Sequence, residues 1–197
     1  MRVLLMGNPN VGKSALFSRI TGTKAVVSNY AGTTVGFTRG SMKLGGEEVE
    51  VIDVPGTYSL EPTSKAEEVA AKMLLEGDVV INVVDATNLE RNLYLTLELL
   101  EKGIPMVVAL NLWDDTKHRG ITVDITKLGS LLGIPVVPTV AVSGQGIKEL
   151  VEHIPEARSV KLAPRTKDER WAAVGGIITE AQTLAHRHHT WLERLQD

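Results

Sequence analysis

The chain has 197 residues and a formal net charge of −3, and its composition is 43% hydrophobic but only 4% aromatic. This length suits one compact domain with an appendage, and the core should be mostly aliphatic. The absence of cysteine excludes disulfides, thiolate metal sites and cysteine nucleophiles. The slightly acidic balance predicts no nucleic-acid partner. The sequence shows neither a signal-peptide pattern nor an apolar run near the ~18–20 residues of a membrane span, so we expect a soluble chain.

Short apolar runs alternate with longer amphipathic segments. The expected strands cover residues 2–6, 37–44, 49–54, 79–84, 106–110 and 136–140. The expected helices cover residues 14–20, 65–75, 89–101, 125–132 and 148–153. Gly45-Gly46 should join two strands as a hairpin, which makes one strand antiparallel. The pattern predicts an α/β fold with a mostly parallel, doubly wound, six-stranded sheet.

A phosphate-binding motif follows the first expected strand and opens the first helix. Its residues are Gly7, Asn8, Pro9, Asn10, Val11, Gly12, Lys13 and Ser14. Backbone N–H groups and the helix N-terminus of such a P-loop bind phosphate. Lys13 should reach the β- and γ-phosphates, the Ser14 hydroxyl should hold Mg²⁺, and Ala15 should also contact the nucleotide. The alternative is a glycine-rich turn that binds nothing.

Two further segments should sense the γ-phosphate. Asp53 ends the third strand and begins D-x-x-G, so its carboxylate would act on Mg²⁺ and Gly56 would turn its N–H toward the phosphate. A loop hydroxyl should complete the Mg²⁺ shell, and we expect Thr34 rather than Thr33 to supply it. The alternatives are a chance D-x-x-G and an ordinary polar loop.

The ends of the last two strands should hold the base. Asp114, in Asn111-Leu112-Trp113-Asp114, could accept hydrogen bonds from both guanine N–H donors, which adenine lacks. Asn111 should tie this segment to the P-loop, while Leu112 stands where most GTPases carry a lysine. The Ala141 N–H should contact guanine O6, and we expect its neighbours Val140 and Val142 to line a mobile base loop. A turn rich in Asn and Asp is the alternative.

These five elements resemble the motifs of P-loop GTPases, and more closely the N-terminal G domain of the ferrous iron transport protein B family. The resemblance rests on the P-loop, on residues 29–35 and above all on Pro55-Gly56-Thr57-Tyr58-Ser59-Leu60. It implies GTP and GDP binding and slow GTP hydrolysis, with Asn10, Lys13, Thr34 and Gly56 as the catalytic residues. It further implies a potassium ion held by Asn10 in place of an arginine.

The same resemblance implies a switch domain that powers or gates iron(II) uptake. Its partner would be the transporter's own transmembrane domain, absent from this chain, at the cytoplasmic face of the bacterial inner membrane. A homo-oligomer of this chain is a further alternative. One alternative is a cytosolic GTPase acting on ribosomes or tRNA. Another is a regulatory nucleotide-binding module with little turnover, because Thr57 stands where many small GTPases place a water-orienting glutamine.

The change in composition after residue 154 predicts a linker (156–166) that follows the G domain (1–155). The resemblance implies that residues 167–197 are a shortened helical regulatory segment leading toward the membrane. An apolar stripe through Trp171, Val174 and Ile178 predicts one helix that docks on the G domain or pairs with a second copy. His186, His188 and His189 could hold a metal, but a solvated helix end is the expected role.

Overall fold

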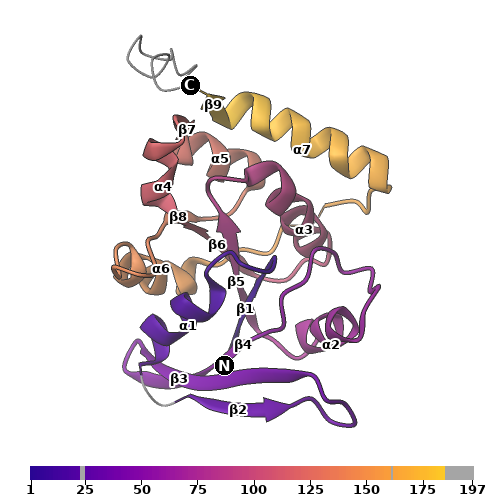
Figure 1. Ribbon diagram of the computed structural model, residues 1–197, viewed down its shortest axis with the longest axis vertical. Helices are drawn as coiled ribbons and strands as arrows, with labels where there is room; N and C mark the ends of the chain where they lie inside the picture. The colour runs from indigo at the N-terminus through magenta and orange to yellow at the C-terminus, as the bar shows by residue number, and fades with distance from the viewer. Residues whose placement is uncertain (23–24, 161, 185–197) are drawn as a thin grey trace, which may run out of the picture.

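The computed structural model describes residues 1–22, 25–160 and 162–184. A seven-stranded sheet with the order β2-β3-β4-β1-β5-β6-β8 forms the centre of the molecule (Figure 1). Its strands are β1 (Arg2–Gly7), β2 (Val26–Asn29), β3 (Gly36–Leu44), β4 (Glu47–Asp53), β5 (Val79–Asp85), β6 (Met106–Asn111) and β8 (Val136–Pro138). Among the described strands of this sheet, β3 alone runs against the rest. The expected antiparallel strand is thus confirmed, and β2 is a seventh strand that we did not predict.

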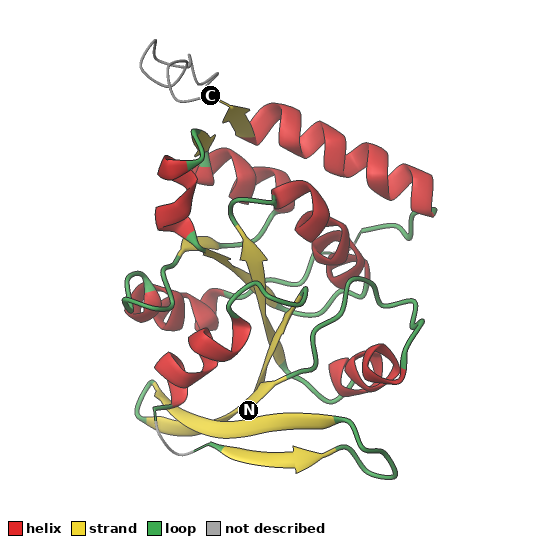
Figure 2. Ribbon diagram, viewed as in Figure 1, coloured by secondary structure: helices red, strands yellow, loops and turns green. Residues whose placement is uncertain are grey.

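Helices cover both faces of this sheet (Figure 2). They are α1 (Lys13–Thr21), α2 (Lys65–Leu74), α3 (Leu89–Glu101), α4 (Trp113–His118), α5 (Ile125–Leu132), α6 (Ile147–His153), a 3-10 turn (Ile154–Glu156) and α7 (Lys167–Ala181). Alternate residues of β1 enter the two halves of the core, because successive side chains of a strand point to opposite faces. Leu4 and Met6 pack with α2, α3 and α5, whereas Val3 and Leu5 pack with α1 and α6. The expected doubly wound α/β fold is confirmed.

The hairpin between β3 and β4 has the expected two-residue turn. Leu44 pairs with Glu47 across it. Gly45 and Gly46 have φ angles of 60° and 90°, a left-handed pair that matches the twist of the flanking strands and favours glycine at both positions. This turn fixes the register that places Asp53 at the end of β4.

The C-terminal segment differs from the expected single helix. A capping box of Thr166 and Glu169 starts α7, but the helix ends at Ala181. A short strand β9 (Gln182–Leu184) follows and pairs antiparallel with β7 (Ile121–Val123). The expectation of one helix across 167–197 is therefore wrong after residue 181, because backbone pairing with β7 replaces the next helical turn. The later positions of the predicted stripe, Ala185, Leu192 and Leu195, and the histidines at 186, 188 and 189 lie outside the described residues.

The first half of the stripe packs on the α/β fold of the same chain, which is one of the two expected outcomes. Val174 is fully buried and Ala181 is 2% exposed, both within the core that α3 and α5 share. The Trp171 ring lies 4.7 Å from the Tyr94 ring, in a tilted stack. Figure 1 shows α7 lying across these two helices. Intramolecular packing thus supplies the stability that an isolated helix of this length lacks.

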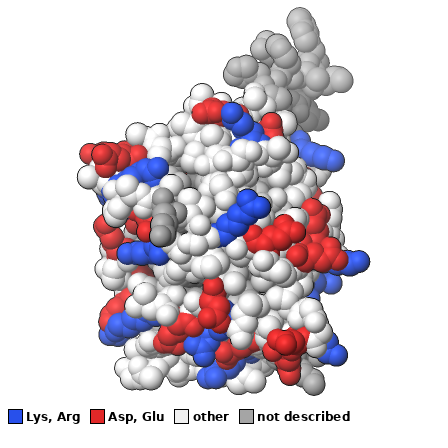
Figure 3. Space-filling view, turned by 180° about the vertical axis from the view of Figure 1, so that it is seen from behind, with Lys and Arg blue, Asp and Glu red and all other residues white. Residues whose placement is uncertain are grey.

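Acidic and basic side chains are interspersed over the face of the molecule drawn in Figure 3. Across the described parts of the chain, every helix is too short or too polar to cross a membrane.

Candidate functional site

The P-loop connects β1 to α1 at the carboxyl edge of the sheet, and its backbone conformation is specific. Gly12 has a φ of 84°, and a Cβ built there would overlap the side-chain amide of Asn111. Any other residue at position 12 would therefore be strained and would displace Asn111. Asn10 also takes a left-handed conformation, with a φ of 67°, which is uncommon outside glycine. Non-glycine residues held in this region cluster at functional sites.

Lys13 and Ser14 converge on one carboxylate at the end of β4. The Lys13 ammonium donates to Asp53 Oδ1 at 2.7 Å and to the Val54 carbonyl at 2.6 Å. The Ser14 hydroxyl donates to Asp53 Oδ2 at 2.7 Å. The Lys13 and Asp53 side chains are only 11% and 9% exposed, so solvent screens this charge pair weakly. A hydroxyl beside a carboxylate is the hard oxygen donor set that Mg²⁺ prefers, and the site fits that ion.

A cavity of about 380 Å³ opens above the P-loop. It gathers most of the residues that we expect to hold phosphate. Its lining consists of Asn8, Pro9, Asn10, Gly12, Lys13, Ser14, Ala15 and Gly56. A second cavity of about 390 Å³ shares Lys13, Ser14 and Gly56 and adds Asp53. Gly7 and Val11 are buried beneath the loop.

The two threonines of the loop before β3 lie apart from this cavity. The Thr33 hydroxyl donates to the Tyr30 carbonyl at 2.9 Å and accepts from the Val35 N–H at 3.2 Å. Thr34 is exposed, and it lines a cavity of about 550 Å³ with Gly32, Thr33 and Lys65. The structure therefore does not bring Thr34 to Ser14 and Asp53, although it leaves Thr34 the more accessible of the two hydroxyls.

Asn111 connects three segments through one side-chain amide. Its Nδ2 donates to the Val11 carbonyl of the P-loop at 2.9 Å. Its Oδ1 accepts from the Ala141 N–H at 3.0 Å and from the Thr139 hydroxyl at 3.2 Å. The expected tie between Asn111 and the P-loop is confirmed. The Ala141 N–H that we assigned to guanine O6 donates to Asn111 here.

The remaining residues that we expect to contact the base differ in exposure. Leu112 has a φ of 59°, so this turn places a branched apolar residue in a left-handed conformation. Asp114 is exposed, in the first turn of α4. In the loop after β8, Val140 and Ala141 are buried while Val142 is 75% exposed. The base half of the site is thus held by backbone turns and by Asn111.

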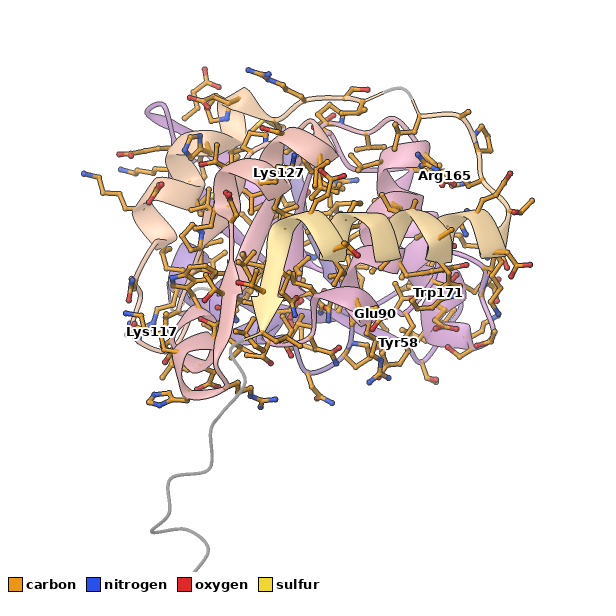
Figure 4. All side chains as sticks on the ribbon, turned by 90° about the horizontal axis from the view of Figure 1, so that it is seen from above. Tyr58, Glu90, Lys117, Lys127, Arg165 and Trp171 are labelled. Carbon is orange, nitrogen blue, oxygen red and sulfur yellow. The ribbon has the colours of Figure 1, made fainter. Side chains whose placement is uncertain are left out.

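A buried charge network, which we did not predict from the sequence, links the segment after D-x-x-G to α7. Glu98 of α3 accepts from the Leu60 N–H at 2.7 Å and from the Ser59 hydroxyl at 3.0 Å. Arg170 donates to Glu98 at 3.3 Å and to the Tyr94 hydroxyl at 2.9 Å. Figure 4 shows Tyr58 and Trp171, neighbours of these residues, on the same side of the molecule.

Glu101 completes the network: its two carboxylate oxygens accept from Nη2 and Nε of Arg170, one edge of the guanidinium, at 2.8 and 3.2 Å. Burial raises the pKa of the Glu98 carboxyl, against the hydrogen bonds from Leu60 and Ser59 and the charge of Arg170. The bond to Glu101 raises the pKa of Arg170 above its usual value. Arg170 is 6% exposed, which is rare for arginine without a partner. The only sequence signal was a pair of acids one turn apart on a helix.

The sequence profile of ferrous iron transport protein B matches residues 1–154. The Fe(2+) transporter FeoB of Escherichia coli K12 is 48% identical over 152 residues, which are 74% of this chain and 20% of that protein. An Fe(2+) transport protein A/FeoB fusion protein of Porphyromonas gingivalis is 49% identical over 155 residues, 77% of this chain and 18% of the fusion. The chain thus spans about a fifth of the length of these relatives.

Solved structures agree with these matches. The cytosolic domain of L. pneumophila FeoB has a TM-score of 0.87 and 33% identity, with 93% of this chain and all of that chain covered. The GMPPNP form of the T. maritima FeoB cytosolic domain has a TM-score of 0.85 and 30% identity, with 93% and 99% covered. A GDP-bound mutant of S. thermophilus NFeoB has a TM-score of 0.84 and 28% identity, with 93% and 100% covered. Fold, motifs and profile lead to one conclusion: the chain belongs to the ferrous iron transport protein B family.

Proposed function

We propose that this chain is the guanine-nucleotide switch domain of an iron(II) transporter, and that it hydrolyses GTP slowly. The convergence of Lys13 and Ser14 on Asp53 carries the proposal, because it joins a phosphate-binding cation to a Mg²⁺ donor set. Relatives solved with GDP and with GMPPNP support it. The family match favours this function over a GTPase of the ribosome or tRNA.

The phosphates would lie in the cavity above the P-loop. Lys13 would neutralise the β- and γ-phosphates, and backbone N–H groups at the start of α1 would bind the rest. Ser14 and Asp53 would hold Mg²⁺, which supplies charge neutralisation between the phosphate oxygens. Thr34 would join them only when the γ-phosphate draws its loop inward, since it lies on a separate cavity here.

Base recognition would come from Asp114, with Ala141 as the second contact. An exposed carboxylate can accept from both guanine donors and would face no donor pair on adenine. When nucleotide binds, the Ala141 N–H would stop donating to Asn111 Oδ1 and would donate to guanine O6 instead. Asn111 would remain bonded to the P-loop, so the base and phosphate ends stay connected.

Hydrolysis should be slow because Thr57 does not orient water. Its hydroxyl donates to the Ser59 carbonyl at 2.6 Å, and the residue is 1% exposed. Gly56 would supply a backbone N–H near the γ-phosphate. A potassium ion, held by Asn10 and nearby loop carbonyls, would neutralise the charge that develops between the phosphates. Asn10 is exposed, and it lines the cavity above the P-loop.

In the whole transporter, residues 156–166 would link the G domain to a shortened regulatory segment that begins with α7. The Glu98–Arg170 network would transmit the state of the segment after D-x-x-G to that helix and on to the transmembrane domain. In this arrangement the chain would lie at the cytoplasmic face of the inner membrane. The segment after D-x-x-G would keep its hydrogen bonds to Glu98 in one nucleotide state and lose them in the other. This change would gate iron(II) uptake.

Single-turnover GTP hydrolysis in equal KCl and NaCl tests the proposal. Wild type should bind GTP and GDP, release phosphate slowly and be faster in KCl, and Asn10→Ala should lose the potassium preference. Thr34→Ala should keep GDP affinity and lose hydrolysis. Failure of the wild type to bind GDP would refute the nucleotide site, and equal rates in both salts would refute the potassium site alone.

Docking of α7 needs its own test. Arg170→Met removes the partner of two buried carboxylates, so the free energy of unfolding should fall by about 3–5 kcal/mol. Lys167→Met, at an exposed position of the same helix, is the control.

Coupling between the nucleotide site and α7 also requires that Glu98→Gln change the hydrolysis rate while GDP affinity stays near wild type. A normal rate in this variant would contradict signal transfer through Glu98.

A further inference from the structure

A cavity of about 690 Å³ lies between α1, α6 and the β3–β4 hairpin. This volume is within the range of about 300–1,000 Å³ that is typical of small-molecule sites. Figure 1 shows α1 between α6 and β3, on the same side of the sheet. The lining of this cavity shares no residue with the two cavities at the P-loop, as far as the described residues show. The proposed function therefore leaves it unused.

The lining combines an apolar surface with cations from three elements. Ile20, Leu44, Ile147 and Val151 form the apolar part. Arg19 of α1, Lys43 of β3 and Lys148 of α6 supply the positive charges, against the single acid Glu152. Glu152 approaches Lys148 only at 3.7 Å, and both side chains are largely exposed, so this pair is weak. A ligand with an anionic head and an apolar body matches this lining.

Arg19 belongs both to this cavity and to the base loop. Its Nε donates to the Ala141 carbonyl at 3.0 Å, and its Nη2 donates to the Val142 carbonyl. A guanidinium carries five N–H donors in a planar fork, so the edge formed by Nη1 and Nη2 keeps donors for a further acceptor. A carboxylate binds such an edge through two parallel bonds. Arg19 can thus bind a ligand in the cavity without leaving the loop.

We propose that this cavity is a second ligand site, that it takes a small amphiphilic carboxylate, and that Arg19 couples its occupancy to nucleotide release. The proposal rests on the proposed function, because the Ala141 loop must contact guanine. A bound carboxylate would fix the Arg19 side chain and thereby hold the loop carbonyls in place. GDP should then dissociate more slowly.

The surroundings of the cavity favour a small ligand over an anionic membrane surface. Glu47 and Glu48 of the hairpin and Glu149 of α6 are exposed close to the lining residues in sequence. A flat anionic surface would meet these carboxylates, and like charges repel. A single carboxylate inside the cavity would meet the cations instead.

Octanoate is a suitable probe, with octylamine as the control of opposite charge. Binding is read from the methyl NMR signals of Ile20 and Ile147 during a millimolar titration. Release is read from the displacement of a fluorescent GDP. In wild type, octanoate should shift these methyls and slow GDP release by about fivefold, the lower end of common coupling factors. Octylamine should do neither.

Two variants separate binding from coupling. Lys43→Gln/Lys148→Gln keeps Arg19 on the loop, so its basal GDP release should be normal while octanoate binds more weakly. Arg19→Lys keeps the charge but lacks the planar fork that offers one edge to the two carbonyls and another to a carboxylate, so octanoate should still shift the methyls without slowing release. Absence of methyl shifts in wild type, or equal slowing in Arg19→Lys, would overturn the proposal. A wild type that binds octanoate but not GDP would refute the proposed function and with it the coupling.

Discussion

The two ends of the proposed nucleotide site are built in different ways. At the phosphate end, Lys13 and Asp53 are nearly buried and bonded to each other directly over the sheet. At the base end, Asp114 is exposed and Val142 is 75% exposed. The phosphate end is therefore fixed by the packing of β1, β4 and α1. The base end depends on a few hydrogen bonds, chiefly those of Asn111.

This difference teaches that affinity and release can be set separately. A buried ionic centre gives strong, slowly changing contacts, since solvent screens it weakly. An exposed loop opens at small cost, because few buried contacts oppose the opening. The phosphate end should thus determine whether nucleotide binds, and the base end which nucleotide binds and how fast it leaves.

The largest expected effect comes from Lys13→Ala. GTP and GDP affinity should fall by about a hundredfold or more, because hydrogen bonds to charged groups are each worth about 1.5–3 kcal/mol. Calorimetric titration measures this loss. Lys43→Ala removes a lysine outside the site and should bind GDP like wild type. Similar losses in the two variants would erase the contrast between the ends.

Asn111→Ala should give the second largest effect, because it removes the hydrogen bonds that connect the phosphate end of the site to the base end. The variant loses bonds to Val11, Thr139 and Ala141, so the free energy of unfolding should drop by about 2–3 kcal/mol. GDP should also dissociate faster. Urea unfolding and stopped-flow release measure the two changes. Asn88→Ala is the control, because Asn88 is exposed and its side chain makes no cap hydrogen bond at the start of α3.

Asp114→Ala should act on specificity and leave stability unchanged. Preference for GTP over ATP should fall by about tenfold or more, because the guanine donors lose a charged acceptor. The melting temperature should stay close to that of wild type, since Asp114 is exposed. Competition binding measures the preference, with Asp115→Ala as the neighbouring control. ATP binding as tight as GTP binding in wild type would contradict the role of Asp114.

The smallest effect is expected for Val142→Ser. Arg19 contacts the carbonyl of Val142 and not its side chain, which points to solvent. Stability should change by less than about 0.5 kcal/mol. GDP release should likewise be close to wild type. A large increase in release would show that the Val142 side chain, and not hydrogen bonding, holds the base loop.

The sequence predicted the fold and the P-loop well because both depend on local patterns. Apolar runs with glycine turns identified six strands of the main sheet, and G-x-x-x-x-G-K-S identified the loop. We did not predict β2, because Val26 and Val27 are exposed on an edge strand and precede polar residues. We did not predict α4, because it is short and polar. Neither segment carries the periodicity of a half-buried element.

Features set by distant contacts were beyond the sequence. The pairing of β9 with β7 joins segments about sixty residues apart, while the helical stripe runs on unbroken in the sequence. Arg170 meets Glu98 and Glu101 through bonds that span 72 and 69 positions. Arginine is usually exposed, so the sequence alone gave no reason to place Arg170 in the core.

The Asn111 amide has one more consequence. The Ala141 N–H is buried and bonded to Asn111 Oδ1, so its proton can exchange with solvent only when the base loop lifts away from the P-loop. The exchange rate of this single amide would therefore report the opening frequency of the loop. This measurement needs no labelled nucleotide, and it would give the rate of the loop opening that precedes nucleotide release.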